Sequence, residues 1–407
     1  MQKYDKILIV PKKKRTFAAI QRNMTDNKLK IVYVTPALYM AGGVERVLTL
    51  KANYFAEQFG YDITIILTEG KDKSLFYPLS PKVKVINLDL NFEELWTCSF
   101  LKKIWVYLPK QRSFKKLLTA ELMRIRPDIT ISLLRREINF VTGIKDGSKK
   151  IGELHVNRAN YRSFDGEPSN IFKQLFEKFW MNSLVSHLRK LDKFIVLTHE
   201  DREAWPELKD VAVIPDPLSF TPDTISPLTA KRVIAVGRYH YQKGFDLLLK
   251  AWKMVESVCP EWQLAIYGQG NMTPYQTLAA ELGLDTSRYH LCGPTANIQE
   301  EYNNSSLFVF SSRYEGFGMV LVEAMACGLP VVSFACPCGP RDIITDGVDG
   351  ILVEKDNVDA LAHQLLSIIN DEQKRQFMAR AAQKKAATFQ MEQIATRWRN
   401  LFEEVIG

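Results

Sequence analysis

The stretch SLFVFSSRYEGFGMVLVEAMACGLPVVSF, residues 306–334, decides the fold. It opens with a short apolar run at 307–310, which is typical of a buried strand. A glycine-rich turn follows, and residues 319–326 then have the character of a helix that stops at the Gly-Leu-Pro of 328–330. Residues 331–334 predict the next strand. The stretch therefore predicts a strand–turn–helix–strand unit.

Two carboxylates flank the start of this predicted helix, Glu315 before it and Glu323 within it. Free backbone N–H groups at 317–320 would point out of the helix N-terminus, where the dipole favours an anion. Gly316 and Gly318 would let a ligand approach the backbone closely. A diphosphate or a polyhydroxy ring fits such a site. The alternative is a buried turn in which Glu315 caps the helix, but it leaves Glu323 as an unpartnered charge on an apolar helix.

The spacing of Glu315 and Glu323 resembles the Glu-x7-Glu signature of the retaining glycosyltransferases of family 4, and the flanking SSRYEGFG and EAMACGLPVV fit the same pattern. The resemblance runs from about Lys30 to the C-terminus and is looser between residues 90 and 200. It implies the GT-B fold, an α/β architecture in which two Rossmann-like, doubly wound parallel-sheet domains face each other across a cleft. It also implies a retaining, metal-independent hexosyltransferase that uses a nucleotide diphosphate sugar, a UDP-sugar or GDP-sugar, as co-substrate.

The composition agrees with a multidomain globular protein. A length of 407 residues predicts two or three domains, and 46% apolar with 25% charged residues is ordinary for a globular chain. No apolar run is long enough to span a membrane, and no secretory signal is visible. Six cysteines form no disulfide framework, which favours a cytoplasmic location, with the inner face of the cell membrane as a further expectation. Cys336 and Cys338 are expected to lie in a packed turn, since no second Cys/His pair completes a metal site.

Strand-like and helical patterns alternate from Lys30 onward, which predicts parallel doubly wound sheets. The alternation pauses at the Pro-rich stretch 214–229, the best candidate for a linker. The expected organisation is an N-terminal extension (1–27), a first acceptor-side domain (28–217), a second nucleotide-sugar-binding domain (218–390) and a C-terminal helix (391–407) that crosses back to the first domain. The expected strands are 31–35, 63–67, 83–88, 129–133, 151–154 and 194–198 in the first domain, and 233–236, 264–267, 289–292, 307–310, 331–334 and 351–353 in the second.

Further polar and glycine residues follow predicted strands, where ligands bind in open α/β sheets. Gly42 and Gly43 open a helix and would offer N–H groups to the donor diphosphate, although a plain tight turn explains them as well. Arg238 and Lys243 lie in a loop before a helix and would neutralise the diphosphate. His155 follows a strand, and the resemblance places it beside the donor sugar.

The resemblance gives each residue a role. Glu315, His155, Arg238 and Lys243 would be catalytic, and Glu323 would hold the ribose. The diphosphate would also contact Met319 and Val320, and the sugar would lie against Glu315, Gly316, Phe317, Gly318 and Met319. Gly268 and Gly293 would let the base lie against backbone, or are simply tight turns. No metal ligand is expected, because fixed cations and a helix end can offset the charge of the leaving diphosphate.

The first half of the chain is basic, which suggests an anionic partner. Residues 100–126 carry eight Lys and Arg against one Glu, interleaved with aromatic residues, and 171–191 are similar. Such segments suit an anionic membrane surface, and they are equally explained as ordinary helices with an apolar core face. The basic run at 12–15 contacts such a surface or belongs to a disordered tail. No nucleic-acid recognition module is visible, so no nucleic-acid partner is expected.

The expected acceptor is a glycan or a lipid-linked saccharide in polysaccharide biosynthesis, a prediction that rests on the basic first half and the resemblance. Two rival functions remain. A GT-B nucleotide-sugar epimerase would isomerise the sugar without an acceptor, and a catalytically silent paralogue would bind the nucleotide sugar without turning it over.

Overall fold

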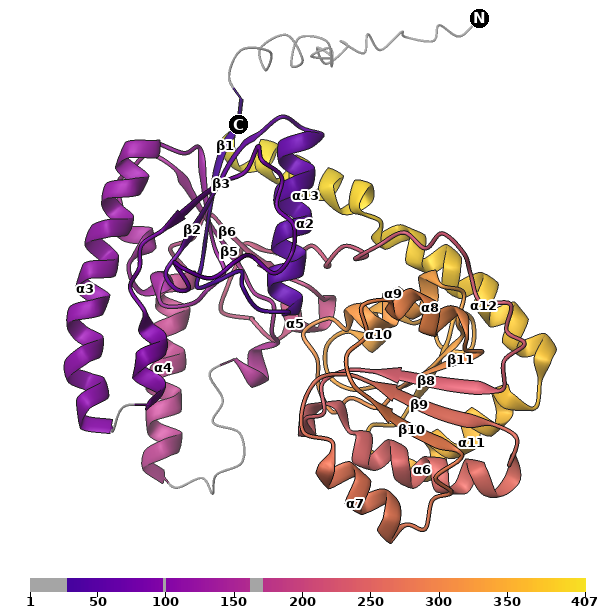
Figure 1. The fold of residues 1–407 in the computed structure, drawn as a ribbon. Coiled ribbons are helices and arrows are strands. Elements are labelled where there is room, and N and C mark those ends of the chain that lie inside the picture. The colour runs from indigo at the N-terminus through magenta and orange to yellow at the C-terminus, as the bar shows by residue number, and fades with distance from the viewer. Residues whose placement is uncertain (1–27, 98–99, 162–170) are drawn as a thin grey trace, which may run out of the picture.

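The computed structural model describes residues 28–97, 100–161 and 171–407, and it contains two sheets with helices on both faces (Figure 1). The strand order is β3-β2-β1-β4-β5-β6-β7 in the first sheet and β10-β9-β8-β11-β12-β13 in the second. Every neighbouring pair of these strands runs parallel. The predicted architecture of two doubly wound parallel sheets is confirmed. The predicted extension at 1–27 and Cys98 lie outside the described residues.

The elements have the following bounds. The first sheet consists of β1 (Lys30–Thr35), β2 (Asp62–Leu67), β3 (Lys84–Asn87), β4 (Ile129–Ser132), β5 (Lys149–Glu153), β6 (Lys193–Val196) and β7 (Val211–Val213). The second consists of β8 (Arg232–Val236), β9 (Gln263–Tyr267), β10 (Tyr289–Cys292), β11 (Leu307–Phe310), β12 (Val331–Phe334) and β13 (Ile351–Val353).

The α-helices are α2 (Gly43–Glu57), α3 (Phe100–Ile125), α4 (Ile171–Leu188), α5 (His199–Glu203), α6 (Phe245–Val258), α7 (Thr273–Glu281), α8 (Ile298–Asn303), α9 (Met319–Ala326), α10 (Pro340–Ile343), α11 (Val358–Ile369), α12 (Glu372–Ala386) and α13 (Met391–Ile406). Short 3-10 turns are η1 (Phe92–Thr97), η2 (Glu137–Asn139), η3 (Val141–Gly143), η4 (Arg158–Asn160), η5 (Tyr241–Lys243) and η6 (Ala387–Phe389).

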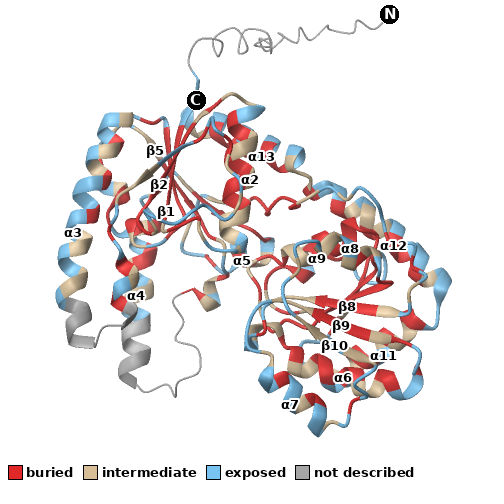
Figure 2. Cartoon of the chain, in the orientation of Figure 1, coloured by how far each residue is buried: buried red, intermediate tan, exposed pale blue. Residues whose placement is uncertain are grey.

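Side chains along the central strands point alternately to the two faces of each sheet, so each half of the molecule contains two apolar layers. Figure 2 shows these strands as largely buried. In β1, Ile31 and Tyr33 face the layer that contains α2 and α13, whereas Val32 and Val34 face the layer that contains α3. Successive strand residues point to opposite faces, so a strand covered on both sides is apolar throughout. The second sheet follows the same rule, with α6 and α11 on one face and α9 on the other.

The last helix, α13, packs on the first sheet although it follows the second sheet in sequence (Figure 1). Its Trp398 and Phe402 are almost fully buried there, and the ring of Phe402 lies 5.7 Å from that of Phe55 on α2. Apolar residues at helical spacing predicted a buried face for this segment. The helix therefore ties the end of the chain to the first half.

The strand orders place two topological switch points opposite each other. The order in which strands are added to the sheet reverses between β1 and β4 in the first sheet and between β8 and β11 in the second. Loops that leave the carboxyl ends of such strands diverge and leave a crevice for a ligand. The loops that follow β1, β8 and β11 carry most of the residues singled out in the sequence.

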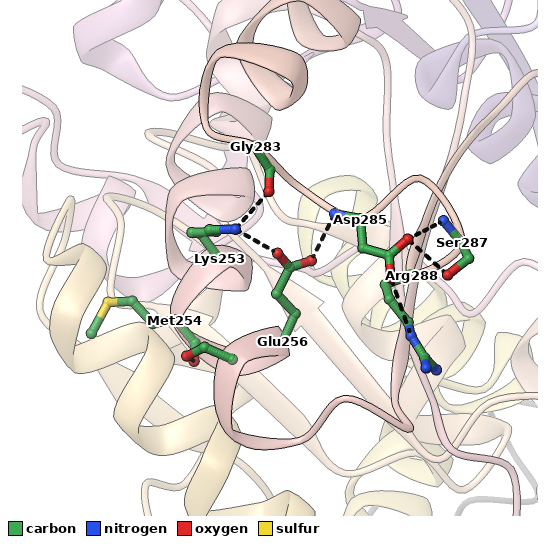
Figure 3. Close-up of polar contacts among 8 residues, drawn as sticks. Lys253, Met254, Glu256, Gly283, Asp285, Ser287 and Arg288 are labelled. Carbon is green, nitrogen blue, oxygen red and sulfur yellow. Dashed lines mark hydrogen bonds and ion pairs between the residues drawn. The ribbon is translucent and has the colours of Figure 1, made fainter.

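The connection between α7 and β10 is anchored to α6 by polar contacts (Figure 3). Lys253 donates to the carbonyl oxygen of Gly283 at 2.6 Å and to Glu256 at 3.0 Å, and Glu256 in turn accepts from the backbone N–H of Asp285 at 3.4 Å. The Asp285 carboxylate accepts from both the N–H and the hydroxyl of Ser287. These bonds set the path of the chain into β10, which ends beside the predicted base site.

Two elements differ from the sequence-based expectation. The sequence pattern at 113–125 predicts a helix, but this segment is only the second half of α3, which begins at Phe100 and contains Pro109. Proline usually ends a helix, because it lacks an N–H and its ring clashes with the preceding turn. The three-residue strand β7 adds an edge to the first sheet where the sequence merges into the Pro-rich linker.

Candidate functional site

A cavity of about 260 Å³ lies between the two halves, at the facing carboxyl ends of their sheets. The first half contributes Ala41, Gly42, Gly43, Arg46 and Tyr77 to its wall, and the second half contributes Val236, Tyr267, Gly268, Pro294, Thr295, Ile298, Met319, Val320 and Glu323. Six of the predicted site residues are among them. Predicted site residues that lie far apart in the chain thus share one cavity wall.

Glu323 is buried at the cavity wall and is the most heavily bonded group there. Its Oε1 accepts hydrogen bonds from the Ser219 hydroxyl and from Nη1 of Arg46, the latter at 3.1 Å. Its Oε2 accepts from the Tyr302 hydroxyl at 3.4 Å. The charge that the sequence left without a stated partner on an apolar helix is therefore paired, and one of its partners comes from the other half.

Glu315 and Lys243 form a second ion pair, with Nζ 2.6 Å from Oε1. Both side chains are mostly buried, at 14% and 8% exposure for Lys243 and Glu315 respectively. Gln242 donates to the backbone carbonyl of Tyr314 beside this pair. The pair joins the loop after β8 to the turn before α9. A pairing of these two predicted catalytic residues was not foreseen in the sequence.

The turn before α9 has the backbone geometry that its glycines allow. Gly318 has a φ of 99°, a left-handed conformation that favours glycine, and it precedes the first turn of α9. Phe317 is buried and packs edge-on against Phe389, so its side chain belongs to the core of the second half while its backbone faces the turn. Met319 and Val320, the first residues of α9, line the cavity, so their free backbone N–H groups lie at its wall.

The turn also touches the first half directly. A Cβ on Gly316 would overlap the carbonyl oxygen of His155, so the backbones are in close contact at this point. Asn157 donates from its side chain to the carbonyl oxygen of Glu315 at 2.6 Å. His155, predicted to lie opposite the sugar, is thus adjacent to the turn that carries Glu315.

The His155 side chain belongs to a buried charge cluster made of Lys51, Glu153, His155 and Asp216. Nε2 of His155 lies 3.2 Å from Glu153, and Nδ1 lies 3.4 Å from Asp216 in the linker. Lys51 on α2 pairs with Glu153, and its ammonium group lies 4.5 Å from the ring centroid of Trp398. Glu153, the last residue of β5, thus contacts the histidine two residues further along the chain.

Burial and charge oppose each other in this cluster. Burial alone would lower the pKa of His155, but the carboxylates of Glu153 and Asp216 outweigh it and raise that pKa to about 9. Burial alone would raise the pKa of Glu153, but Lys51 and His155 outweigh it and lower that pKa to about 2. At neutral pH His155 is therefore a cation held between two carboxylates, a form that does not accept a proton.

Ligand atoms of Glu153, His155 and Asp216 all lie within 4.8 Å of one another, which is the kind of arrangement that can hold a metal ion. Lys51 already places a positive charge on Glu153, and the imidazolium of His155 supplies a second. Lys51 and His155 therefore supply positive charge that balances the carboxylates of Glu153 and Asp216.

The remaining predicted residues lie at the edge of the site. Arg238 is exposed, and within the described part of the chain no hydrogen bond or ion pair holds it. Gly293 borders the cavity through its neighbour Pro294. Gly42 precedes α2, and the carboxylate of Glu45 lies over it, where it competes with any other anion for the positive end of that helix.

Arg46, Asn157, Asp216 and Lys51 were not singled out in the sequence. The first three contact predicted site residues, and Lys51 pairs with Glu153, which contacts His155. Three of them lie in segments where nothing in the local pattern sets them apart. Arg46 carried one signal, since it is a cation in the first turn of a helix, where the dipole favours the opposite charge.

Several known proteins resemble this chain in sequence or in fold. Residues 221–385 match the family model for glycosyl transferases group 1. An uncharacterised glycosyltransferase of Haemophilus influenzae is 26% identical over 91% of this chain and 99% of its own length. The amylovoran biosynthesis glycosyltransferase AmsD of Erwinia amylovora is 34% identical over 52% of this chain, and the matched part is 62% of AmsD.

A solved structure of Anabaena HepE in complex with UDP and glucose superposes with a TM-score of 0.67 over 92% of this chain and 100% of HepE, at 18% identity. At that identity the likeness concerns the fold, and it agrees with the two-sheet arrangement described above. Residues 221–385, most of the second half, therefore carry the match to the glycosyl transferases group 1, the retaining glycosyltransferases of family 4, and the two sheets together have the GT-B fold.

Proposed function

We propose that this enzyme transfers a hexose from a UDP-sugar or a GDP-sugar to a hydroxyl of a glycan or lipid-linked saccharide in polysaccharide biosynthesis. The observation that carries the proposal is the cavity between the halves, walled by the N-terminus of α9 and by Glu323 and adjoined by the Lys243–Glu315 pair. The similarity to AmsD, an amylovoran biosynthesis enzyme, supports the polysaccharide context.

The groups along the cavity wall suggest how the donor is oriented in this site. Glu323 at the cavity wall accepts hydrogen bonds from ribose hydroxyls, and the base lies towards Gly268 and Gly293. The diphosphate meets the N–H groups of Met319 and Val320, where the helix dipole favours an anion. This direction brings the sugar to the turn that carries Glu315, beside His155.

The chemistry follows from fixed positive charge. The bond between the anomeric carbon and the diphosphate oxygen breaks, and the acceptor oxygen bonds to the same face of that carbon. The acceptor proton passes to the leaving phosphate oxygen. Arg238, Lys243 and the end of α9 stabilise the leaving diphosphate, so that a divalent cation is not needed. The protonated His155 adds positive charge opposite the second half.

The direct test is turnover with purified protein. A thermal-shift screen of nucleotide sugars identifies the donor, because a ligand that binds the native state raises its melting point. Release of nucleoside diphosphate is then measured with and without acceptor. We expect Lys243→Ala and Glu315→Ala to lower kcat by about 10²- to 10³-fold, the usual effect of removing one group that stabilises the transition state. Lys250→Ala, an exposed residue on α6, is the matched control.

Other outcomes would overturn the proposal. Unchanged turnover in both variants would reject the site assignment. Isomerised sugar without acceptor would identify an epimerase, and donor binding without turnover would identify a silent paralogue. Loss of activity in EDTA, restored by a divalent cation, would reject the metal-independent mechanism.

The proposal of a lipid-linked acceptor rests on the outer surface of α3 and α4. Trp105 is 81% exposed and Phe179 is 71% exposed, and Leu108 is also exposed. Arg112 and Lys116 follow Trp105 at helical spacing and are exposed as well. An aromatic side chain among exposed cations suits the interface of an anionic bilayer. Within the described residues, no helix combines the length and apolar character that crossing a bilayer requires.

Co-sedimentation with vesicles tests this surface. We expect the protein to bind vesicles that contain phosphatidylglycerol more tightly than vesicles of phosphatidylcholine alone. Trp105→Ala should weaken that binding, whereas Phe377→Ala on α12, another exposed aromatic residue, should not. Equal binding of the two vesicle types would reject an electrostatic contact with the membrane.

A further inference from the structure

Arg46 is placed unusually for a helical cation. It lies in the first turn of α2, where the positive end of the helix dipole opposes a positive side chain. Its guanidinium group reaches across to the second half and lies 3.1 Å from Glu323, while its side chain keeps 30% of its exposure. The ring of Tyr77 lies 6.0 Å from its central carbon. The position is thus unfavourable locally and is compensated by a contact between the halves.

Arg46 is the one cation among the described residues that line the cavity. Lys243 is held by Glu315 next to the cavity, and Arg238 lies exposed outside it. The amide end of α2 is a weak anion site, because the carboxylate of Glu45 lies over Gly42. A diphosphate in the cavity therefore meets Arg46 as the nearest positive side chain of the first half.

Glu323 does not depend on Arg46 alone. The same carboxylate also accepts hydrogen bonds from Ser219 and Tyr302, both in the second half. If Arg46 moved away, Glu323 would keep two donors and would gain a free position on Oε1. A buried carboxylate left with no partner would be costly, but this one remains hydrogen-bonded.

We propose that Arg46 is a donor-binding cation from the first half that exchanges partners: the ribose hydroxyls of the donor take its place on Glu323, and its guanidinium group turns to the diphosphate. The inference rests on the proposed function, since it takes Glu323 as the ribose ligand. A guanidinium group pairs with phosphate through two parallel hydrogen bonds, stronger than a single contact with a shared carboxylate oxygen. The exchange would couple donor binding to the closing of the two halves.

The rival interpretation is that Arg46 is a permanent strut between the halves. The two interpretations differ in how much Arg46 adds to the affinity for the phosphates of the donor. The experiment therefore compares the binding of UDP and of uridine, by titration calorimetry, to wild-type protein, Arg46→Met and Arg46→Lys. GDP and guanosine are run in parallel. Arg380→Met, an exposed arginine on α12, is the matched control, and urea unfolding checks that each variant folds.

For Arg46→Met we expect the affinity for UDP to fall about 10- to 100-fold, the range of one or two charge-assisted hydrogen bonds. The affinity for uridine should stay the same or rise, because Glu323 is released. Arg46→Lys should retain part of the UDP affinity.

Unchanged UDP affinity in Arg46→Met, or an equal loss for UDP and uridine, would reject the partner exchange while leaving the proposed function in place. If the wild-type protein bound neither UDP nor GDP, both the partner exchange and the proposed function would be rejected.

Discussion

The buried charge cluster around His155 and the ion pairs at the cavity differ in how far solvent reaches them. In the cluster, the side chains are between 1% and 8% exposed. At the cavity, Lys243 keeps 14% and Arg46 keeps 30%. A fully enclosed set of charges cannot exchange partners with a ligand, whereas a partly open pair can. We therefore expect the cluster to hold the first half together and the cavity pairs to bind the ligand.

The largest expected effect is the loss of Lys51. Lys51→Met removes a cation that is 1% exposed and leaves the Glu153 carboxylate in a buried site without it. Breaking a buried pair by removing one partner typically costs about 3–5 kcal/mol. We expect the free energy of unfolding, measured in urea, to fall by about that amount. Lys115→Met, an exposed lysine on α3, should change it by less than about 0.5 kcal/mol.

The double variant Lys51→Met/Glu153→Gln sharpens this result. Neutralising both partners removes the unpaired charge, so part of the lost stability should return. If the single variant were as stable as the wild-type protein, the cluster would not hold the fold, and the contrast with the cavity pairs would be wrong.

The sequence was sufficient where local pattern decides structure. The short apolar runs at Leu307–Phe310 and Val331–Phe334 are strands with the bounds predicted, because strands buried on both faces must be apolar throughout. The Glu-x7-Glu pattern likewise located one wall of the cavity. The first part of α3 was expected as a helix only as one of two interpretations of residues 100–126, and Pro109 within it is a residue that usually ends a helix.

Contacts between the halves could not be read in this way. Arg46 and Glu323 are 277 residues apart in sequence, and Asn157 and Glu315 are 158 apart. No local pattern links such residues, so their pairing follows only from the way in which the two sheets face each other. The predicted site residues could be identified from the sequence, but their contact partners could be identified only from the structure.

A medium effect is expected at the point where the halves touch. Gly316→Ala places a methyl group against the carbonyl oxygen of His155, with Cα of Val156 at 3.2 Å, so backbone must move. Overpacking of this kind costs about 1–3 kcal/mol. We expect lower stability and weaker donor binding, measured by urea unfolding and calorimetry. Gly143→Ala is the control, because a methyl group there meets no atom within 4 Å. Equal effects in the two variants would show that the halves are not in contact at Gly316.

The effect that is smallest per measured step, about 1 kcal/mol for each pH unit, concerns pH and separates the cluster from the cavity pairs most directly. The pKa of His155 is raised to about 9, above its ordinary value of 6.5. Between these values the folded protein holds a proton that the unfolded chain has lost, so stability falls as pH rises. The contribution is complete below about pH 6.5 and is lost through pH 9, with a slope on the order of 1 kcal/mol per pH unit. Among the described residues, the carboxylates of Glu153 and Asp216 face the ring, and Lys51 pairs with Glu153.

Urea unfolding at several pH values between 6 and 10 measures this slope. His155→Gln should be less stable at pH 6.5 and should show a flatter dependence above it, because the glutamine carries no proton to lose. Lys243→Ala should keep the wild-type slope, since its ion pair lies outside the cluster. Parallel profiles for wild-type protein and His155→Gln would mean that His155 is not held as a cation. The positive charge that we assign to it opposite the second half would then have to come from another residue.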